Sequence, residues 1–357
     1  MKKPDHLVKK NKYAMLRRRF AAFRANSVGW WSSWIFLALF LITLPAEFLA
    51  NDRPLWIKVA DQSYFPVFFD YQETDFGGFL PLNADYHDQD FMAMLYEQEA
   101  EMLWPLVRYS YDTIVDDVAV SPAPPSLAHP FGVDVRSRDV FANIIYGLRI
   151  SILFGLLLSG LTTTSGVICG AIQGYFGGWT DLIIERVIEI WSAIPMLFVL
   201  ILLGSLFKPS FFTLAILFFI FGWFAGAGVV RAEFYRARNF DYVKAARALG
   251  FSHWRIMFKH VLPNALVATM TFLPFTLAGS VSVLTSLDYL GFGLPPDYPS
   301  LGNMALQARN NLDAPWIALS LFGALGGLLM LMIFIGEAIR DAFDPRKMYT
   351  NSEGLSA

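Results

Sequence analysis

The stretch DYVKAARALGFSHWRIMFKHVLPNAL, residues 241–266, is basic and has the periodicity of two short helices joined at a glycine. Apolar runs flank it on both sides, at residues 209–230 and from residue 260 onward. Each run has about the length that a helix needs to cross a bilayer, roughly 20 residues. The stretch is therefore predicted to be a charged helical hairpin between two membrane spans.

The whole chain has the composition of an integral membrane protein. Of its 357 residues, 55% are hydrophobic and 16% are charged, whereas soluble domains carry about 25% charged residues. The single cysteine, Cys169, excludes a disulfide within the chain and any site with several cysteine ligands.

Six stretches are apolar enough and long enough to be membrane spans. The predicted helices lie at about 27–50, 148–172, 188–207, 210–231, 262–286 and 315–337. The predicted fold is therefore an all-α integral membrane protein with six transmembrane helices and an insert between the first two. The first span is longer than the apolar core of a signal peptide, about 7–15 residues, so we expect an uncleaved anchor, although PAEFLAND is a weak cleavage-like site.

Lysine and arginine near the span ends predict the orientation. Residues 1–27 carry nine Lys/Arg against one acid, and residues 231–260 carry seven against two. Residues 51–143 carry 16 Asp/Glu against five Lys/Arg. The segments expected in the cytoplasm are the N-terminus (1–26), the loop 232–261 and the tail (339–357), which leaves the acidic insert 51–143 outside.

The predicted spans contain no Asp, Glu, Lys or Arg in their interiors, and no phosphate-binding loop G-x-x-x-x-G-K-[ST] occurs in the chain. Carriers coupled to protons or ions usually bury such charges in their path, although sodium held by backbone oxygens would escape this test. The pattern speaks against a self-powered carrier. If transport needs energy, another subunit should supply it.

Histidines give little support for an enzyme or a metal site. The cluster ADYHDQD groups His87 with Asp85, Asp88 and Asp90 and could bind a metal, but a solvated acidic loop is the favoured interpretation. No Ser/His/Asp or Cys/His arrangement is recognisable, so we expect no catalytic residue, no metal and no cofactor in this chain.

Glycines recur every four residues at Gly166, Gly170, Gly174 and Gly178. On a helix this spacing makes a flat stripe that lets another backbone approach closely. Packing within the chain is the favoured interpretation, and a contact between subunits is the alternative. Gly178 is expected to lie in a turn already, because two adjacent glycines disfavour a helix.

The hairpin has recognisable helix ends. Asp241 is expected to cap the first helix, and Gly250 suits the left-handed residue that ends it. Ser252 is expected to cap the second helix, and Pro263 to bend that helix into the fifth span.

The first helix of the hairpin has small residues on one predicted face. Tyr242, Ala245, Ala246 and Leu249 are spaced i, i+3, i+4 and i+7. A small face favours insertion into a groove on a partner. A basic helix lying on anionic lipid is the alternative; it explains the charges but not the two alanines.

Four motifs resemble those of ABC importer permeases of the dipeptide and oligopeptide branch, and they occur along the chain in the order that the family has. KAARALG followed by KHVLPNA resembles the EAA-x3-G…LP loop of that family, and HPFGVDVRSRDV is similar to H-P-x-G-T-D-x-x-G-R-D-V. GYFGGWTD matches G-Y-x-G-G-W-x-D, and SLDYLGFGLPPDYPSLGNM is similar to S-L-x-F-L-G-x-G…P-S-W-G-x-M. The matches cover about residues 129–310, and the details are closest to the Yej type, the C-position subunit for peptides such as microcin C.

The resemblance implies a permease of the type-1 ABC transmembrane fold in the bacterial inner membrane, with both termini in the cytoplasm. It also implies a second, different permease, a cytoplasmic ATPase that binds ATP and Mg, an extracytoplasmic solute-binding protein, and no nucleic acid. In the family the EAA-like loop is the coupling helix that docks on the ATPase. Carried over by motif, the coupling residues are Asp241, Tyr242, Lys244, Ala245, Ala246, Leu249, Gly250, Leu262 and Pro263.

Three positions depart from the family motifs. Lys244 stands where the family has Glu, which would favour the positive end of a helix by about 0.3–1 kcal/mol. Ser137 replaces a glycine, and Leu301 a commoner tryptophan. The first departure puts in doubt any role of the Glu itself.

The insert 51–143 is too long for a plain loop. Residues 90–109 are predicted to have helical content, and SPAPPSLAHP reads as an extended linker. We expect either a small cap that meets the loaded binding protein or a passive cover of the partner permease.

The sequence therefore predicts a permease subunit that forms half of a path for peptides or peptide-like solutes. Rival interpretations are a nickel or other small-solute permease, a secondary carrier, and a membrane-anchored binding or sensor protein that uses the insert.

Overall fold

The computed structural model describes residues 17–59, 62–206 and 209–343, which form two compact units. The first unit draws on Met1–Leu37, Leu153–Val283 and Leu328–Ala357, and the second on Ala38–Ile152 and Leu284–Gly327. Parts of the predicted cytoplasmic termini, 1–16 and 344–357, lie outside the described residues.

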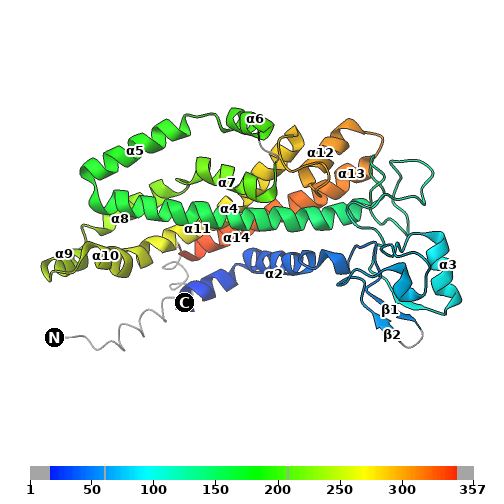
Figure 1. Cartoon of the computed structure of the whole chain (residues 1–357). Coiled ribbons are helices and arrows are strands. Elements are labelled where there is room, and N and C mark those ends of the chain that lie inside the picture. Colours follow the sequence, from blue (N-terminus) through cyan, green and yellow to red (C-terminus); the bar gives the residue numbers. More distant parts are fainter. Residues whose placement is uncertain (1–16, 60–61, 207–208, 344–357) are drawn as a thin grey trace. The chain divides into compact units, whose positions relative to one another are not determined.

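The described chain is mostly helical (Figure 1). After a helix at Arg17–Ala25, the α-helices are α2 (Ser27–Thr43), α3 (Gln89–Glu97), α4 (Val140–Phe176), α5 (Gly178–Ser192), α6 (Met196–Leu206), α7 (Phe211–Gly222), α8 (Ala227–Ala237), α9 (Asp241–Ala248), α10 (His253–Ile256), α11 (Leu262–Leu290), α12 (Leu301–Asn310), α13 (Pro315–Leu321) and α14 (Gly327–Phe343). Short 3₁₀ turns occupy Ala46–Phe48 and Glu73–Phe76, and π turns occupy Met257–Val261 and Phe322–Gly326.

The insert corrects the all-α prediction, because it contains a three-stranded antiparallel sheet. Its strands β1 (Trp56–Val59), β2 (Gln62–Tyr64) and β3 (Glu101–Leu103) pair in the order β2-β1-β3. Ile57 lies opposite Tyr64 on one side and Met102 on the other. The helix predicted in residues 90–109 is present only up to Glu97, because the chain then turns into β3.

A small core holds the sheet and α3 together. Its buried members are Ile57, Val59, Phe76, Tyr86, Phe91 and Leu95. Asp88 caps α3 by accepting from the backbone N–H of Phe91 at 2.9 Å. Phe91 and Leu95 of this helix belong to the same core as Ile57 of β1, and Figure 1 shows α3 near the strands. The insert is therefore a folded element with a core of its own.

Three helices in the described residues are long and apolar enough to cross a membrane: Val140–Phe176, His253–Leu290 and Pro315–Phe343. Two bent pairs would add two more spans: Arg17–Ala25 with Ser27–Thr43, bent by 93°, and Phe211–Gly222 with Ala227–Ala237, bent by 44°. The predicted span at 188–207 falls on the end of α5, a break after Ser192, and α6, which has 11 residues. The six predicted spans thus become three to five by this measure.

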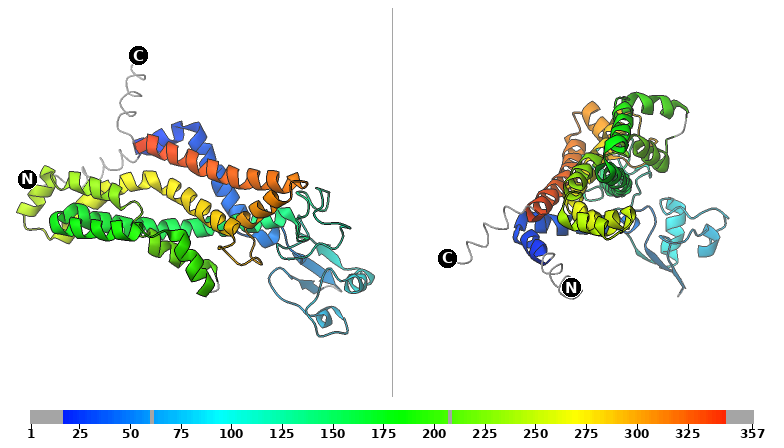
Figure 2. Two further views of the ribbon diagram at one scale, coloured as in Figure 1. Left: turned by 90° about the horizontal axis from the view of Figure 1, so that it is seen from above. Right: turned by 90° about the vertical axis from the view of Figure 1, so that its left-hand side faces the viewer.

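The first unit is packed through small residues. A Cβ built on Gly155 of α4 would lie 2.9 Å from Leu277 and Val281 of α11, and Figure 2 shows these two helices side by side. On α14, a Cβ on Gly336 would lie 2.8 Å from the ring of Phe275. Close backbone approach therefore organises the helices of this unit.

Candidate functional site

The predicted helical hairpin, residues 241–266, contains α9, the turn at Gly250, α10, the π turn and the start of α11, and it lies in the first unit. Gly250 has the left-handed backbone angle φ of +75°. Its N–H donates to Arg247 O at 3.0 Å, and the N–H of Phe251 donates to Ala246 O at 3.2 Å. These two bonds are the pair that closes a helix in a Schellman motif. The side chain of Ser252 then caps α10 by accepting from the N–H of Arg255.

The first end of the hairpin differs from the prediction. Phe240, not Asp241, is the residue before α9, and it makes no side-chain cap. Asp241 is the first helical residue, so Lys244 lies four residues after the cap and not three. Lys244 is exposed and only 4.0 Å from the Asp241 carboxylate. A Glu at this position could not form the expected capping box with residue 241.

The four residues predicted to share a face do not share one environment. Tyr242, Ala245 and Leu249 are exposed, and Leu249 is 74% exposed. Ala246 is only 6% exposed and lies in the core of the unit. The prediction of one outward face is therefore wrong for Ala246, whose neighbour in that core is Val243.

That core ties the hairpin to α4, α8 and the start of α11. Its buried members are Ala171, Tyr175, Val230, Phe234, Ala237, Val243, Ala246, Ile256, Met257, Val261 and Ala265. Tyr175 at the end of α4 also hydrogen-bonds His253 Nδ1 at 3.0 Å, and the guanidinium of Arg247 lies 5.5 Å from the Tyr175 ring centre. A displacement of the hairpin would therefore disturb both α4 and α8.

Three large apolar side chains of the hairpin are exposed, and the basic side chains Lys244 and Arg247 are exposed on the same segment. Leu249, Trp254 and Phe258 are 74%, 57% and 55% exposed. The last two rings are stacked, with centroids 6.0 Å apart. We call the set Tyr242, Lys244, Ala245, Leu249, Trp254 and Phe258 the hairpin surface. Of these, only Tyr242, Lys244, Ala245 and Leu249 were singled out from the sequence as coupling residues.

Pro263 follows a π turn and does not separate two helices. The turn Met257–Val261 connects α10 to α11, and His253–Leu290 is one continuous helix. Leu262 packs against the core, whereas Pro263 is exposed. Because proline has no N–H to donate, a wider turn before it spares the helix an unmet bond.

The glycine stripe of α4 faces the segment 225–234. A Cβ on Gly166, Gly170 or Gly174 would collide with the backbone carbonyl oxygens of Ala225, Ala227 and Arg231 respectively. This contact lies within the chain. Gly177 and Gly178 have positive φ and make the turn between α4 and α5.

A charged cluster joins α4, α5 and α8 next to this stripe. Arg231 of α8 reaches Asp181 of α5 through Nε at 2.7 Å and Nη2 at 2.8 Å, and Glu185 through Nη1 at 2.9 Å. Tyr235 donates to Asp181 at 2.8 Å. Burial disfavours the Asp181 charge, but the bonds from Arg231 and Tyr235 outweigh it and lower the pKa of the carboxyl. Gln173 of α4 completes the cluster through Glu185 at 3.1 Å.

In the second unit, Asp288 organises the loop after α11. Its buried carboxylate accepts from the N–H of Leu294 at 2.7 Å and from the hydroxyl of Ser300. Ser300 in turn caps α12. A Cβ on Gly302 would collide with the carbonyl oxygen of Thr285, so the first turn of α12 needs a glycine at residue 302.

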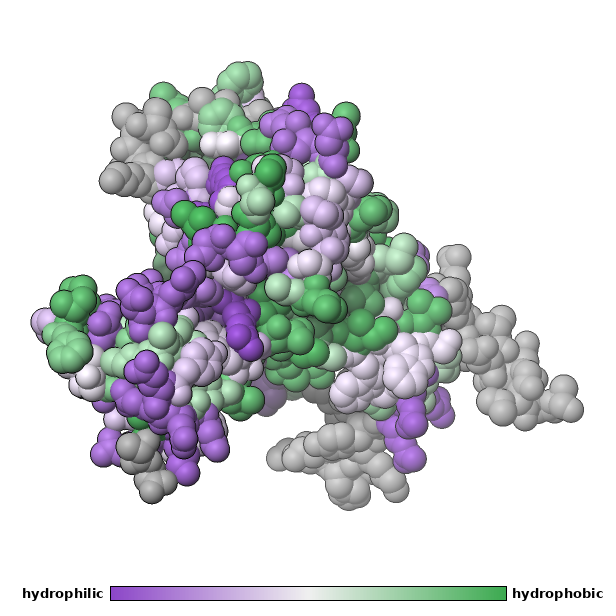
Figure 3. Space-filling model, turned by 90° about the vertical axis from the view of Figure 1, so that its right-hand side faces the viewer, coloured by the Kyte–Doolittle hydropathy of each residue, from purple (hydrophilic) through white to green (hydrophobic). Residues whose placement is uncertain are grey.

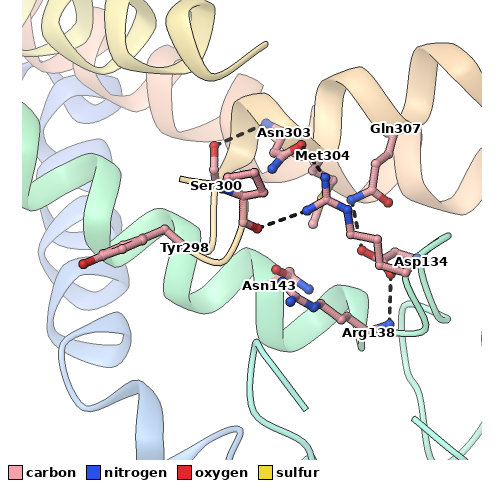
Figure 4. Close-up of a pocket in the computed structure, with 10 residues that line it drawn as sticks. Asp134, Arg138, Asn143, Tyr298, Ser300, Asn303, Met304 and Gln307 are labelled. Atoms are coloured by element: carbon pink, nitrogen blue, oxygen red, sulfur yellow. Dashed lines mark hydrogen bonds between the residues drawn. The ribbon is translucent and has the colours of Figure 1, made fainter. Parts of the chain in front are cut away.

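A shallow pocket lies between this loop and residues 134–143 of the same unit (Figure 4). The buried Asp134 accepts from the N–H groups of Arg136 at 2.8 Å and Arg138 at 2.9 Å, and from Gln307 Nε2 at 3.0 Å. The guanidinium of Arg136 donates to Pro296 O at 3.0 Å. These bonds connect the two motif segments in the fold.

The histidine before this segment is part of a buried network. His129 Nδ1 lies 2.8 Å from Asp139, and Nε2 lies 3.0 Å from Asp117. Burial lowers the pKa of His129, but the two carboxylates outweigh it, so the pKa is raised. Asp139 also accepts from the N–H of Ala142 at the start of α4 at 2.8 Å. Within the described residues no group of three or more His, Cys, Asp or Glu could hold a metal ion.

Sequence reasoning missed the charged cluster and the two buried networks. Asp181, Asp288 and His129 each stand inside a recognised motif, which was the available signal. The partners of Asp181 lie about 50 residues away in the chain. Ser300 and Asp139 lie in the same motifs as Asp288 and His129, but the motifs do not show which side chains bond to each other.

The comparisons with known proteins agree with the motifs. Residues 166–349 match the family described as binding-protein-dependent transport system inner membrane component. The chain is 50% identical to "Inner membrane ABC transporter permease protein YejE" of Escherichia coli, over 92% of this chain and 96% of that protein. It is 48% identical to "Peptidoglycan transport system permease protein YejE" of Agrobacterium fabrum, over 93% of each chain.

A more distant relative matches about two thirds of the chain. The chain is 35% identical to "Oligopeptide transport system permease protein OppC" of Bacillus subtilis, over 67% of this chain and 78% of that protein.

Proposed function

The chain belongs to the family of binding-protein-dependent transport system inner membrane components, and we propose that it forms half of an inner-membrane path for peptides or peptide-like solutes. The observation that carries this proposal is the identity of 48–50% with two such permeases over more than 90% of the chain. Peptides and peptidoglycan fragments are the substrate classes that the names of the relatives support. A peptide of the microcin C kind belongs to the same chemical class.

The partners proposed are a second, different permease that supplies the other half of the path, a cytoplasmic ATPase and an extracytoplasmic binding protein. ATP and Mg would bind to the ATPase. The chain itself would be a transport subunit and not an enzyme.

The membrane topology proposed has six spans with both termini in the cytoplasm and residues 51–143 outside. The distribution of Lys and Arg supports it. In this topology the break between α5 and α6 lies in the third span, because the predicted range 188–207 includes the end of α5 and all of α6.

The hairpin surface is the proposed contact with the ATPase. Exposed leucine, tryptophan and phenylalanine side chains on a short, rigid hairpin are the kind of apolar centre that contributes most to protein interfaces. Lys244 and the other basic residues at its edges would form the polar rim. Ala246 supports this contact from beneath, by filling the core between α9 and α8.

The charged cluster would connect the hairpin surface, through α8, to α5. α8 leads directly into the hairpin, and Arg231 of α8 holds Asp181 and Glu185 of α5. Movement of the hairpin when the ATPase closes would therefore reach α5 through this ion pair. The chain has no phosphate-binding loop of its own. The movement that drives transport would therefore have to come from the ATPase and pass through the hairpin to the membrane helices.

The test is uptake of a labelled peptide into proteoliposomes that contain the assembled transporter, with the binding protein outside and ATP inside. We expect uptake that needs ATP and stops in its absence while a proton gradient is maintained. Uptake that continues on the gradient alone would identify a secondary carrier. A parallel measurement with nickel ions tests the small-solute alternative, for which we expect no transport.

Site-specific cross-linking tests the docking contact separately. Cys169 is buried, so a Cys169→Ser chain gives a background for single cysteines at Leu249 and Phe258. We expect both to cross-link to the ATPase. Cross-links from Leu312→Cys, which is exposed in the second unit, serve as the control and are expected to be absent.

A further inference from the structure

The insert carries an exposed loop rich in phenylalanine, and the proposed function does not explain its exposure. Phe65, Phe68 and Phe69 are 44%, 65% and 61% exposed. Scattered apolar residues on a surface need no explanation. Three phenylalanines within five residues form a local apolar patch, which marks a contact with another protein or with lipid. We call residues 65–69 the aromatic loop.

The loop differs in charge from the rest of the insert. Residues 51–143 carry 16 Asp/Glu, yet residues 62–69 (QSYFPVFF) contain no charged side chain. Figure 3 shows hydrophilic side chains over much of the insert, interrupted by hydrophobic ones. Asp70, the residue directly after the loop, forms an ion pair with Arg53, so it does not present an uncompensated charge beside the loop.

The backbone of the loop is largely satisfied from within. The N–H groups of Phe68 and Phe69 donate to Phe65 O at 3.0 and 3.2 Å. The N–H of Phe65 donates to the hydroxyl of Tyr71 at 3.4 Å, and residue 66 is a proline without an N–H. A loop that enters an apolar medium must satisfy its polar groups in this way, since an unmet N–H there costs several kcal/mol.

The loop contacts the end of the first predicted span. The ring of Phe68 meets the ring of Phe48 edge to face, with centroids 5.6 Å apart. Phe48 ends the 3₁₀ turn Ala46–Phe48, which begins three residues after α2 ends at Thr43. If α2 crosses the membrane, Phe48 lies at its surface, and the loop beside Phe48 lies at the same depth. Aromatic side chains are enriched at that depth.

We propose that residues 65–69 insert into the headgroup layer of the outer leaflet and anchor the insert to the lipid surface. The proposal rests on the proposed topology, in which α2 is a span and the insert lies outside. A neutral aromatic patch continuous with a span end fits a lipid surface better than it fits an acidic or basic protein partner. The loop would fix the height of the insert above the membrane.

The test is spin labelling of the full transporter in nanodiscs of phosphatidylethanolamine and phosphatidylglycerol, without the binding protein. Single cysteines replace Phe68 and Phe69 in the Cys169→Ser chain. Collision with oxygen, which concentrates among acyl chains, is compared with collision with a water-soluble nickel chelate. Leu41→Cys, in α2, is the lipid control, and Leu127→Cys, fully exposed in the insert, is the water control.

We expect both loop labels to favour oxygen over the chelate at least threefold more than the label at residue 127 does. Preference for the chelate at both loop positions, with residue 41 still in lipid, overturns the proposal and leaves the topology intact. Labels shielded from both reagents also overturn it, because a protein then covers the loop. A label at residue 41 that meets water overturns the topology and the proposal together.

Discussion

Asp181 of α5 and Arg231 of α8 are 50 residues apart in the chain and form two contacts, from Nε to Oδ1 at 2.7 Å and from Nη2 to Oδ2 at 2.8 Å. Breaking a partly buried, hydrogen-bonded pair by removing one charge costs more than the pair contributes net, because the other charge stays uncompensated. Arg231 would keep Glu185 as a partner at 2.9 Å and retains 30% exposure, and both reduce this cost.

We expect Asp181→Asn to lower the free energy of unfolding by about 1–3 kcal/mol and to reduce peptide uptake more than it reduces ATP hydrolysis. The second effect follows if the pair transfers movement from α8 to α5. Thermal unfolding in detergent and the ratio of peptide transported to ATP hydrolysed provide the measurements.

The matched control is Arg186→Gln, which breaks an exposed pair with Glu189 on the same helix. Exposed pairs contribute roughly 0–1 kcal/mol, so this variant should transport normally. An unchanged ratio in Asp181→Asn would remove the transfer role and leave a structural one.

Leu249→Ser should weaken the ATPase contact without unfolding the hairpin, because the side chain is exposed and packs on nothing in the core. A central apolar residue in an interface contributes about 2 kcal/mol, or roughly 30-fold in affinity. Binding of the purified ATPase to the permease pair measures it. Leu312→Ser, equally exposed in the second unit, is expected to bind the ATPase as the parent chain does.

Ala246→Trp should fail for a different reason. The residue is buried, so the larger side chain overpacks the core and costs about 1–3 kcal/mol or more. Lower thermal stability together with lost uptake is the expected result. Normal stability with lost uptake would mean that Ala246 contacts the partner directly.

Gly250→Val should open the hairpin turn. The backbone at Gly250 is left-handed, and a side chain there costs roughly 1–2 kcal/mol. No atom lies within 4 Å of the built Cβ, so the whole effect comes from the backbone. Asn tolerates this conformation better, and Gly250→Asn is therefore expected to keep most of the uptake that Gly250→Val loses.

Gly170→Ala should destabilise the first unit, because its Cβ would collide with Ala227 O. Such overpacking costs about 1–3 kcal/mol. Gly160→Ala, on the same helix with nothing within 4 Å of its Cβ, should be neutral or slightly stabilising. Equal melting temperatures for the two variants would contradict the close packing of α4 against residues 225–234.

The raised pKa of His129 predicts that the stability of the second unit depends on pH. The pKa of His129 is raised above the ordinary value of 6.5, so folding favours the protonated ring. The stabilisation is fully present below about pH 6.5 and is lost as the pH rises through the raised value. Unfolding measured from pH 5.5 to 8.5 should show this loss.

Asp139→Asn removes one carboxylate that holds the proton on His129. We expect the variant to be less stable than the parent chain at low pH and to show a smaller loss of stability as the pH rises. A loss of the same size in both chains would mean that another group carries the dependence.

Local features of the hairpin could be predicted from sequence. Gly250 and Ser252 act through bonds to residues within five positions, so their types nearly determine the turn. The outward face could not be assigned in the same way. Periodicity groups Ala246 with Leu249, but which of the two is covered depends on α8, which the pattern does not contain.

Long-range partners account for most of what the sequence did not predict. The strands of the insert are three or four residues long, and β3 pairs with β1 across more than 40 residues, so no local pattern marks them. Asp181 and Arg231 each look like ordinary charges near span ends. Their pairing follows from the close approach of α4 and α8, which the glycine stripe permits but does not specify.

The π turn Met257–Val261 has a consequence for how this chain can change in length. A π turn contains one residue more than the α-helical turn it replaces, and each helical residue rotates the chain by about 100°. Deleting one residue between Phe258 and Pro263 would let this turn become α-helical. Because the π turn already absorbs the rotation of the extra residue, the stacked Trp254 and Phe258 rings would keep nearly the same direction relative to α11. The π turn therefore accommodates one residue of length between the hairpin and the long helix without changing the direction in which the apolar side of either points.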